Sequence, residues 1–365
     1  MNLEQQRQQA QQAFVDSGEN IVVGTLEGIS ITLDQLKNTT ADSSYVVETF
    51  NSGLTAVVFH LRIDGKSWTL KQKRAVSLVN NIDGQTSFLN EVQRRRDLTN
   101  LKQRESESFK HIVDTQFASF NDGIILSPWI EGEPLSTLNH DVFQQIFTAI
   151  VNLELHGLFE WDFCPGNILL NSQGEITLFD FGYMYQFNSN IHFNNNGLDT
   201  PLFHGVERFE TRFFFDFLLK NTNNLSTEAL FNLYKLEKQC ALEAYQHKLH
   251  QLIVRNADTN VITWQQAINH RWQNALTNDE ELQTLYLVER YRSNVLDLLD
   301  DLHGQSCSPY TLKKADLALS LIDQHFEIIQ SQNGFFFGDE TLSKSDLISK
   351  YKELRVDAQR FLLNK

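Results

Sequence analysis

Residues 156–182, HGLFEWDFCPGNILLNSQGEITLFDFG, contain three side chains whose types and spacing suit phosphoryl transfer. Asp162 is followed five residues later by Asn167, and Asp180 begins an Asp-Phe-Gly triplet after two short apolar runs. A carboxylate can orient and deprotonate an acceptor hydroxyl, and carboxylate and amide oxygens are ligands that Mg²⁺ accepts beside phosphates. The pattern therefore predicts Asp162 as the general base and Asn167 and Asp180 as the metal ligands.

The same segment resembles the protein-kinase superfamily, in which a D-x-x-x-x-N catalytic loop is followed by a β-hairpin and D-F-G. The resemblance covers roughly residues 45–210. It implies an α+β protein with a two-lobed fold, namely a small antiparallel-sheet lobe and a large, mainly helical lobe. It also implies ATP and Mg²⁺ as cofactors and transfer of the γ-phosphate to a hydroxyl of a protein or small molecule.

The superfamily also implies residues upstream that contact the phosphates. The run N-S-G-L-T-A-V-V, which begins at Asn51, lies where the family has G-x-G-x-x-G-x-V, and it keeps only the middle glycine, Gly53. Lys71 ends a W-T-L-K run that resembles the family's V-A-I-K, and Glu91 in the following predicted helix is its expected partner. Lys73 shares a strand face with Lys71 and is the alternative to it.

A third element of the resemblance is the hinge that binds adenine through backbone groups. The run ILSPWIEGEPL at residues 125–135 resembles it, with Ser127 in the gatekeeper position. The resemblance then implies that Pro128 offers its carbonyl and Ile130 its N–H. A proline suits the first of these positions because it lacks only the donor.

Two departures from the protein kinases bear on the substrate. Glu160 and Trp161 precede Asp162 where those kinases have His and Arg, and Cys164 stands where serine/threonine kinases have lysine. The string C-P-G-N is instead similar to the H-P-G-N of aminoglycoside- and choline-type phosphotransferases and of the coenzyme-Q-associated kinase-like proteins. The acceptor is therefore left open between a protein and a small molecule.

Two other functions are compatible with such a fold. One is nucleotidyl transfer, with ATP bound in a flipped pose, and the other is a nucleotide-binding pseudokinase or partner-binding module. Retention of Asp162, Asn167, Asp180 and Lys71 argues against the pseudokinase, which is free to lose them.

Patterning along the chain predicts three regions. Residues 1–44 form an N-terminal extension with a polar helix (3–16) and a small hairpin (20–33), residues 45–127 form the small lobe, and residues 128–365 form the large lobe, helical from about 207. The predicted strands of the small lobe are 45–50, 56–63, 67–73 and 123–130. Helices are predicted at about 86–102 and at 141–156, and two further strands at 168–170 and 176–179.

Composition limits the partners. A formal net charge of −15 argues against a nucleic-acid partner, which requires a basic surface. No apolar run approaches the roughly 20 residues of a membrane span, and the polar, Gln-rich start lacks the apolar core of a signal peptide. Three scattered cysteines fit a reducing compartment, so a cytoplasmic location is expected.

Overall fold

The computed structural model describes residues 1–79 and 81–363. They form two compact units. Unit 1 comprises residues 1–137 and 145–201, and unit 2 comprises residues 138–144 and the described chain from 202 onward. The domain boundaries expected from the sequence, after residues 44 and 127, remain predictions.

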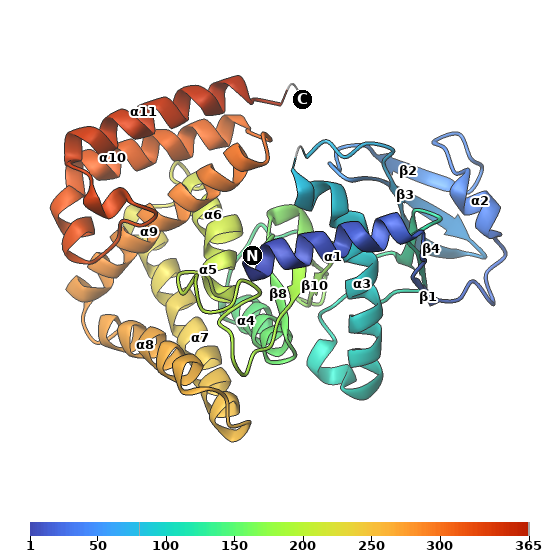
Figure 1. Cartoon of the computed structure of the whole chain (residues 1–365), viewed down its shortest axis with the longest axis horizontal. Helices are drawn as coiled ribbons and strands as arrows, with labels where there is room; N and C mark the ends of the chain where they lie inside the picture. Colours follow the sequence, from blue (N-terminus) through green and yellow to red (C-terminus); the bar gives the residue numbers. More distant parts are fainter. Residues whose placement is uncertain (80, 364–365) are drawn as a thin grey trace. The chain divides into compact units, whose positions relative to one another are not determined.

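Unit 1 contains a six-stranded antiparallel sheet with strand order β1-β5-β6-β4-β3-β2. Figure 1 labels β1, β2, β3 and β4 of this sheet. Asp64 and Gly65 join β3 to β4 with φ angles of 52° and 72°. These angles give the tight hairpin that an Asp-Gly pair favours. The strands are β1 (Val22–Gly24), β2 (Val46–Phe50), β3 (Ala56–Ile63), β4 (Lys66–Lys73), β5 (Phe117–Ser119) and β6 (Ile124–Pro128).

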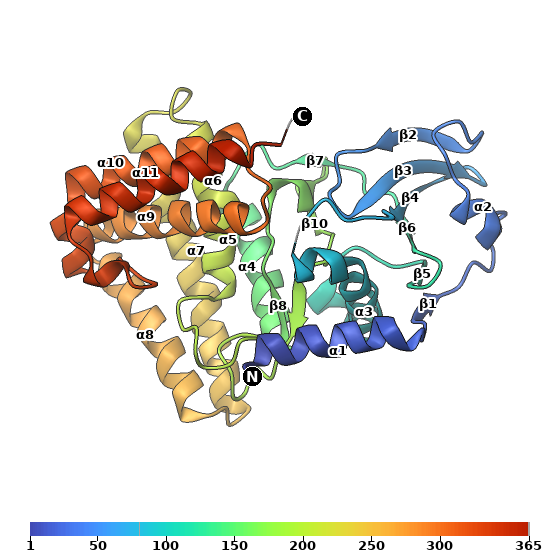
Figure 2. The same cartoon turned by 45° about the horizontal axis from the view of Figure 1, so that its top comes forward.

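The two faces of this sheet have different coverings. Helix α3 (Ile82–Arg104) packs on one face through Phe88, Leu89 and Val92, which lie among buried residues of β1, β5 and β6. Helix α1 (Leu3–Ser17) lies beside α3 (Figure 2). The opposite face buries Leu70 and its neighbours against the segment that contains α2 (Leu33–Lys37). Because strand side chains alternate, the residue after Leu70 points to the α3 side.

The hairpin predicted at residues 20–33 is wrong. Only β1 is a strand there, and it pairs with β5 rather than with the residues that follow it. Gly24 has a φ of 70°, and a Cβ at this position would lie 2.2 Å from the Gln116 carbonyl, so the chain turns away after β1. The second apolar run enters the core at Ile31, and Thr32 then starts α2 with a capping box.

The remaining strands of unit 1 are short and form two small sheets. One has the order β10-β9-β7 and the other pairs β8 with β11. Helix α4 (His140–Leu155) follows β7 and precedes the other four strands, and its residues belong in part to unit 2 and in part to unit 1. The strands are β7 (Glu133–Pro134), β8 (Leu158–Glu160), β9 (Ile168–Leu170), β10 (Ile176–Leu178) and β11 (Met184–Gln186), and the 3₁₀ turns are η1 (Ser106–Phe109) and η2 (Pro165–Asn167).

Unit 2 is helical, as its periodic pattern predicts. The predicted start signals at Ser226 and Ser343 are the N-caps of α7 and α11. A π-helical turn, Glu210–Phe214, separates α5 from α6. The elements are α5 (Gly205–Phe209), α6 (Phe215–Lys220), α7 (Thr227–Val254), α8 (Thr259–Ala275), α9 (Asp279–His303), α10 (Pro309–Ser331), η4 (Asp339–Thr341) and α11 (Lys344–Arg360).

Charged side chains as well as apolar ones fill the core of unit 2. Lys238 is fully buried, and its ammonium contacts the carboxylates of Glu210, Glu289 at 2.7 Å and Glu237 at 3.5 Å. Burial raises the pKa of Glu237 to about 7, and Glu289 adds to this increase.

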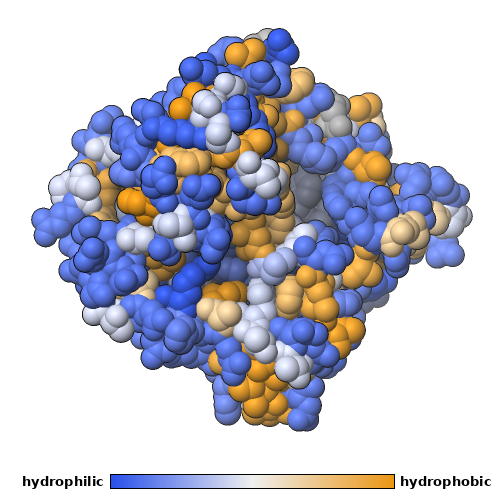
Figure 3. Space-filling view, turned by 60° about the vertical axis from the view of Figure 1, so that its left-hand side comes forward, coloured by the Kyte–Doolittle hydropathy of each residue, from blue (hydrophilic) through white to orange (hydrophobic). Residues whose placement is uncertain are grey.

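The face that Figure 3 shows is mostly hydrophilic, with apolar residues in small groups.

The structure thus has an antiparallel-sheet N-terminal lobe and a large helical lobe, which confirms the predicted α+β, kinase-like fold class. Across residues 1–79 and 81–363, none of the helices combines the length and the apolar character needed to cross a membrane.

Candidate active site

The ends of short strands bring Asp162, Asn167 and Asp180 together. Asp162 follows β8, which is fixed by its pairing with β11, and Asp180 follows β10. Asn167 comes directly before β9, and its carbonyl accepts a hydrogen bond from Phe179 N at 3.1 Å. All three side chains line one small pocket. The hairpin β9-β10 therefore provides the geometry that the spacing of the two motifs predicts.

Asn167 is oriented by hydrogen bonds within its own loop. Its Nδ2 donates to the Asp162 carbonyl at 3.0 Å, and its N–H bonds the Cys164 carbonyl at 2.9 Å. Since the amide nitrogen is engaged, the Oδ1 oxygen is the atom that can coordinate a metal. Asp180 supplies a carboxylate whose side chain is 38% exposed, although its neighbour Phe181 is buried. One amide oxygen and one carboxylate beside phosphates fit the ligand preference of Mg²⁺.

Lys71 joins Asp180 to helix α3. Its Nζ lies 2.6 Å from Glu91 Oε2 and 2.9 Å from Asp180 Oδ1. Burial alone would lower the pKa of Lys71, but the carboxylates of Asp180 and Glu91 raise it, so the ammonium stays charged. Burial likewise opposes the charge on Asp180, yet Lys71 holds the pKa of this carboxyl below its ordinary value. Lys73, the alternative lysine, is exposed at the end of β4.

A second cation completes this group of charges. Arg95 lies one helical turn after Glu91, and its Nη2 contacts Glu91 Oε1 at 3.0 Å. Its guanidinium also lies 5.2 Å from the ring centroid of Phe181. Two buried cations, Lys71 and Arg95, are therefore balanced by Glu91 and Asp180.

The loop at Asn51 and Gly53 is fixed by an arginine that the sequence reasoning missed. Arg74, just after β4, donates to the carbonyls of Gly53 at 2.9 Å and Asn51 at 2.6 Å. A Cβ at Gly53 would lie 2.5 Å from the Ala56 carbonyl, so the tight path of this loop excludes larger residues. Close approach of the backbone, rather than a positive φ, explains this glycine.

The predicted hinge lies where β6 ends. Ser127 is buried opposite Thr69 of β4, and its hydroxyl accepts a hydrogen bond from Arg95 at 3.4 Å. Pro128 is the last residue of β6, and Ile130 follows two residues later. Trp129 lies between them and stacks on His60 with ring centroids 3.8 Å apart.

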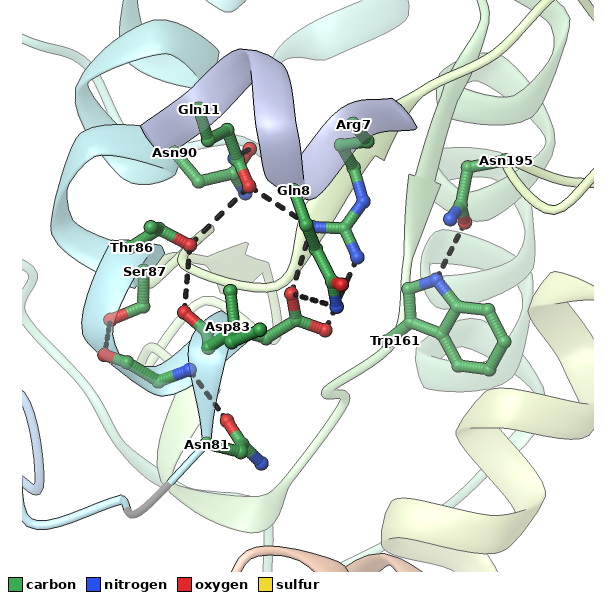
Figure 4. Close-up of polar contacts among 12 residues, drawn as sticks. Arg7, Gln8, Gln11, Asn81, Asp83, Thr86, Ser87, Asn90, Trp161 and Asn195 are labelled. Carbon is green, nitrogen blue, oxygen red and sulfur yellow. Dashed lines mark hydrogen bonds and ion pairs between the residues drawn. The ribbon is translucent and has the colours of Figure 1, made fainter. Parts of the chain in front are cut away.

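The residues before Asp162 have structural partners. Glu160 is buried, and its Oε1 accepts a hydrogen bond from Asp162 N at 2.7 Å. Burial raises the pKa of Glu160 well above its ordinary value. Trp161, which stands where protein kinases have arginine, donates from Nε1 to Asn195 Oδ1 at 2.7 Å (Figure 4).

The structure brings the predicted residues together in two groups, which share Asp180: the Lys71–Glu91–Asp180 contact and the pocket of Asp162, Asn167 and Asp180. The loop residues Asn51 and Gly53 and the hinge residues Pro128 and Ile130 are not among the residues that line this pocket. The roles assigned to these residues remain predictions. The sequence suggested that Arg94, Arg95 and Arg96 form the solvated side of a helix, which is wrong for Arg94 and Arg95 because both are buried. The spacing of four residues from Glu91 on a predicted helix was the signal for the contact of Arg95. Arg74 had no such signal, because its partners are backbone carbonyls distant in sequence.

The antiparallel-sheet lobe and the large helical lobe define the class of protein, which is a two-lobed fold of the protein-kinase type. A family model described as the ABC1 atypical kinase-like domain matches residues 119–196, which include Asp162, Asn167 and the Asp-Phe-Gly triplet. Serine/threonine-protein kinase 36 of Pongo abelii is 29% identical over 135 residues. The match covers 32% of this chain and 10% of that kinase, so the chain spans about a tenth of the relative's length. Together with the fold, the two matches support membership of the protein-kinase-like superfamily.

Proposed function

We propose that this protein is an ATP- and Mg²⁺-dependent phosphotransferase that moves the γ-phosphate to a hydroxyl of a protein or small molecule. The observation that carries the proposal is the contact of Lys71 with both Glu91 and Asp180, at 2.6 and 2.9 Å. Kinase activity requires this lysine–glutamate pair and the metal-binding aspartate to be in place together. The matches to kinase-like proteins support the same conclusion.

Each part of the site then has a task. Asn51 and Gly53 cover the phosphates, Lys71 contacts the α- and β-phosphates, and the Pro128 carbonyl and Ile130 N–H bind adenine. Asn167 and Asp180 would hold Mg²⁺, which would supply charge neutralisation for the transferring phosphoryl group.

The chemical step is a transfer between oxygens. Asp162 accepts the proton of the acceptor hydroxyl as its oxygen forms a bond to the γ-phosphorus. The bond from this phosphorus to the β,γ-bridging oxygen breaks, and ADP leaves. The protein would supply orientation, electrostatic stabilisation through Lys71, and a base, and such a reaction depends mainly on the first two.

The experiment is incubation of the wild-type chain with ATP labelled at the γ- or the α-phosphate, with Mg²⁺ and with candidate acceptors. Transfer of label only from the γ-position supports the proposal. Transfer from the α-position shows nucleotidyl transfer instead, and ATP binding without transfer from either position shows a binding module. The matched pair of variants is Asp162→Asn, which should lose transfer, and Asp42→Asn, an exposed carboxylate that should retain it.

A further inference from the structure

Asn90, the residue before Glu91 on α3, contacts the backbone around the Asp-Phe-Gly triplet. It is 1% exposed, and its Nδ2 lies 3.3 Å from the Phe181 carbonyl, 3.0 Å from that of Gly182 and 2.7 Å from that of Met184. One side-chain amide group thus donates to three backbone carbonyls, all within four residues of Asp180. Sequence reasoning missed this residue, because nothing in its type or spacing distinguishes it from an ordinary helix asparagine.

These contacts fix which way the amide of Asn90 points. Carbonyls only accept hydrogen bonds, so the NH₂ group must face them and Oδ1 must face away. On that opposite side lies Gln11 of α1, whose Nε2 donates to Asn90 Oδ1 at 3.3 Å (Figure 4). Gln11 is 5% exposed, and its own Oε1 accepts from Arg7 at 3.1 Å. In the series Arg7, Gln11 and Asn90, the orientation of each side-chain amide is therefore set by the hydrogen bond to its neighbour.

The contact between α1 and α3 also includes a charged pair. Arg7 binds both carboxylate oxygens of Asp83, at 2.9 and 3.2 Å, and Gln8 donates to the same carboxylate at 3.2 Å (Figure 4). Two parallel hydrogen bonds from a guanidinium restrict geometry more than a point charge does. Arg7 also lies 3.7 Å from the ring centroid of Tyr185, in β11 beyond the triplet. α1 therefore contacts α3 at its first turn and again at Asn90.

Little space separates α3 from the triplet. A Cβ at Gly182 would lie 3.3 Å from Ser87 Cβ, so the backbone of the triplet lies directly against α3. Asp180 has a φ of 66°, a left-handed conformation that non-glycine residues adopt only where the surroundings maintain it. The hydrogen bonds of Asn90 are made to the residues that immediately follow this turn.

From these observations we infer that Asn90 is a positioning residue for Asp180, and that α1, through Gln11, holds Asn90 in its working orientation. The N-terminal helix is then part of the support of the metal site and not merely an appendage to the sheet. The inference rests on the proposed function, because it assigns a support to the same metal-binding carboxylate. Loss of the Gln11–Asn90 contact should weaken Mg²⁺-dependent nucleotide binding, although in this proposal neither residue contacts the nucleotide.

The test compares the full-length wild type with Asn90→Asp and Gln11→Ala. Asn90→Asp keeps the shape of the side chain but replaces the donor with an acceptor that faces three carbonyls. Gln11→Ala removes only the outer contact and is the milder variant, which decides the question if Asn90→Asp does not fold. The matched controls are Asn100→Ala and Gln9→Ala, exposed residues of the same types on the same two helices.

The measurements are the affinities for ATP and for adenosine, each with and without Mg²⁺. We expect the Mg²⁺-dependent gain in ATP affinity to fall on the order of tenfold in Asn90→Asp, and less in Gln11→Ala, as hydrogen bonds are lost. Adenosine affinity should be unchanged in both, which a general loss of folding would not produce. Both controls should behave as the wild type does.

Two failures are distinguishable. If the wild type gains ATP affinity with Mg²⁺ and both variants gain as much, the inference is overturned and the proposed function stands. If the wild type itself shows no gain with Mg²⁺, the proposed function is overturned, and this inference with it.

Discussion

Replacing Lys71 with methionine tests the central contact of the site. The change keeps a long side chain on β4 but removes the cation that contacts Glu91 and Asp180. Glu91 retains Arg95 at 3.0 Å, whereas Asp180 loses its partner at 2.9 Å. Four balanced charges become a group with one excess negative charge beside the buried residues in the middle of α3.

The magnitude follows from burial. Removing one partner of a buried ion pair costs roughly 3–5 kcal/mol. The Asp180 side chain is 38% exposed, so water screens part of this loss, and Arg95 still neutralises Glu91. We therefore expect Lys71→Met to lower the free energy of unfolding by about 2–3 kcal/mol at neutral pH.

The effect should depend on pH in a defined direction. Lys71 holds the pKa of Asp180 below its ordinary value. A lowered pKa means that the stabilisation is complete above the ordinary pKa, about 4, and is lost as pH falls through the folded-state value. The difference between wild type and Lys71→Met should therefore be constant at neutral pH and shrink in acid.

The assay is urea unfolding followed by tryptophan fluorescence, with ATP affinity measured on the same samples. The matched control is Lys73→Met, two residues along the same strand face, where the lysine is exposed and lies 5.0 Å from the Phe120 ring centroid. Lys73→Met should lower the free energy of unfolding by less than about 1 kcal/mol and leave ATP affinity unchanged. Equal unfolding midpoints for the two variants, or weaker ATP binding in Lys73→Met alone, would refute the assignment of Lys71.

Three further predictions address the metal, the base and the core of unit 2. Asp180→Ala should lose the Mg²⁺-dependent gain in ATP affinity but bind adenosine as the wild type does; a retained Mg²⁺ response in these titrations would mean that another residue holds the metal. Asp162→Asn should slow transfer by roughly 10²–10⁴-fold in a steady-state assay while ATP affinity changes little; near-normal turnover would remove Asp162 from its role. The pKa of Glu237, raised to about 7, favours its protonated form in the folded state, so its contribution to stability is complete below its ordinary pKa and lost as pH rises through about 7. Glu237→Gln, which stays neutral, should therefore gain stability relative to wild type between about pH 5 and 8 in urea unfolding, and a constant difference would contradict the shifted pKa.

The sequence was informative where local pattern and chemistry coincide. The Asp64-Gly65 turn, the alternating strands β3 and β4 and the helix caps at Ser226 and Ser343 depend on neighbouring residues and were predicted correctly. The predicted contact of Lys71 with Glu91 also appears in the structure, because strand alternation and the order of elements leave few alternatives.

What the sequence could not show depends on residues distant along the chain. The apolar run before residue 25 suggested a local hairpin, but its strand partner, β5, lies more than 90 residues later. Asn90 and Arg74 bind backbone carbonyls. Every residue has the same carbonyl, so the sequence does not indicate which ones these side chains contact. For the same reason, no sequence motif marks Asn90 as the residue that we propose supports Asp180.

The division of the chain has a consequence for folding during synthesis. Residues 138–144 belong to unit 2, although they are followed by 57 residues of unit 1 before unit 2 resumes. Phe143, fully buried in the finished protein, packs against Phe209 and Phe214, which leave the ribosome much later. Because synthesis proceeds at about 5–20 residues per second, several seconds pass before Phe209 and Phe214 are available to pack against this apolar segment. A nascent chain, or a fragment that ends at residue 201, therefore exposes the apolar start of α4. Both should depend on chaperones more than the chain of 365 residues does.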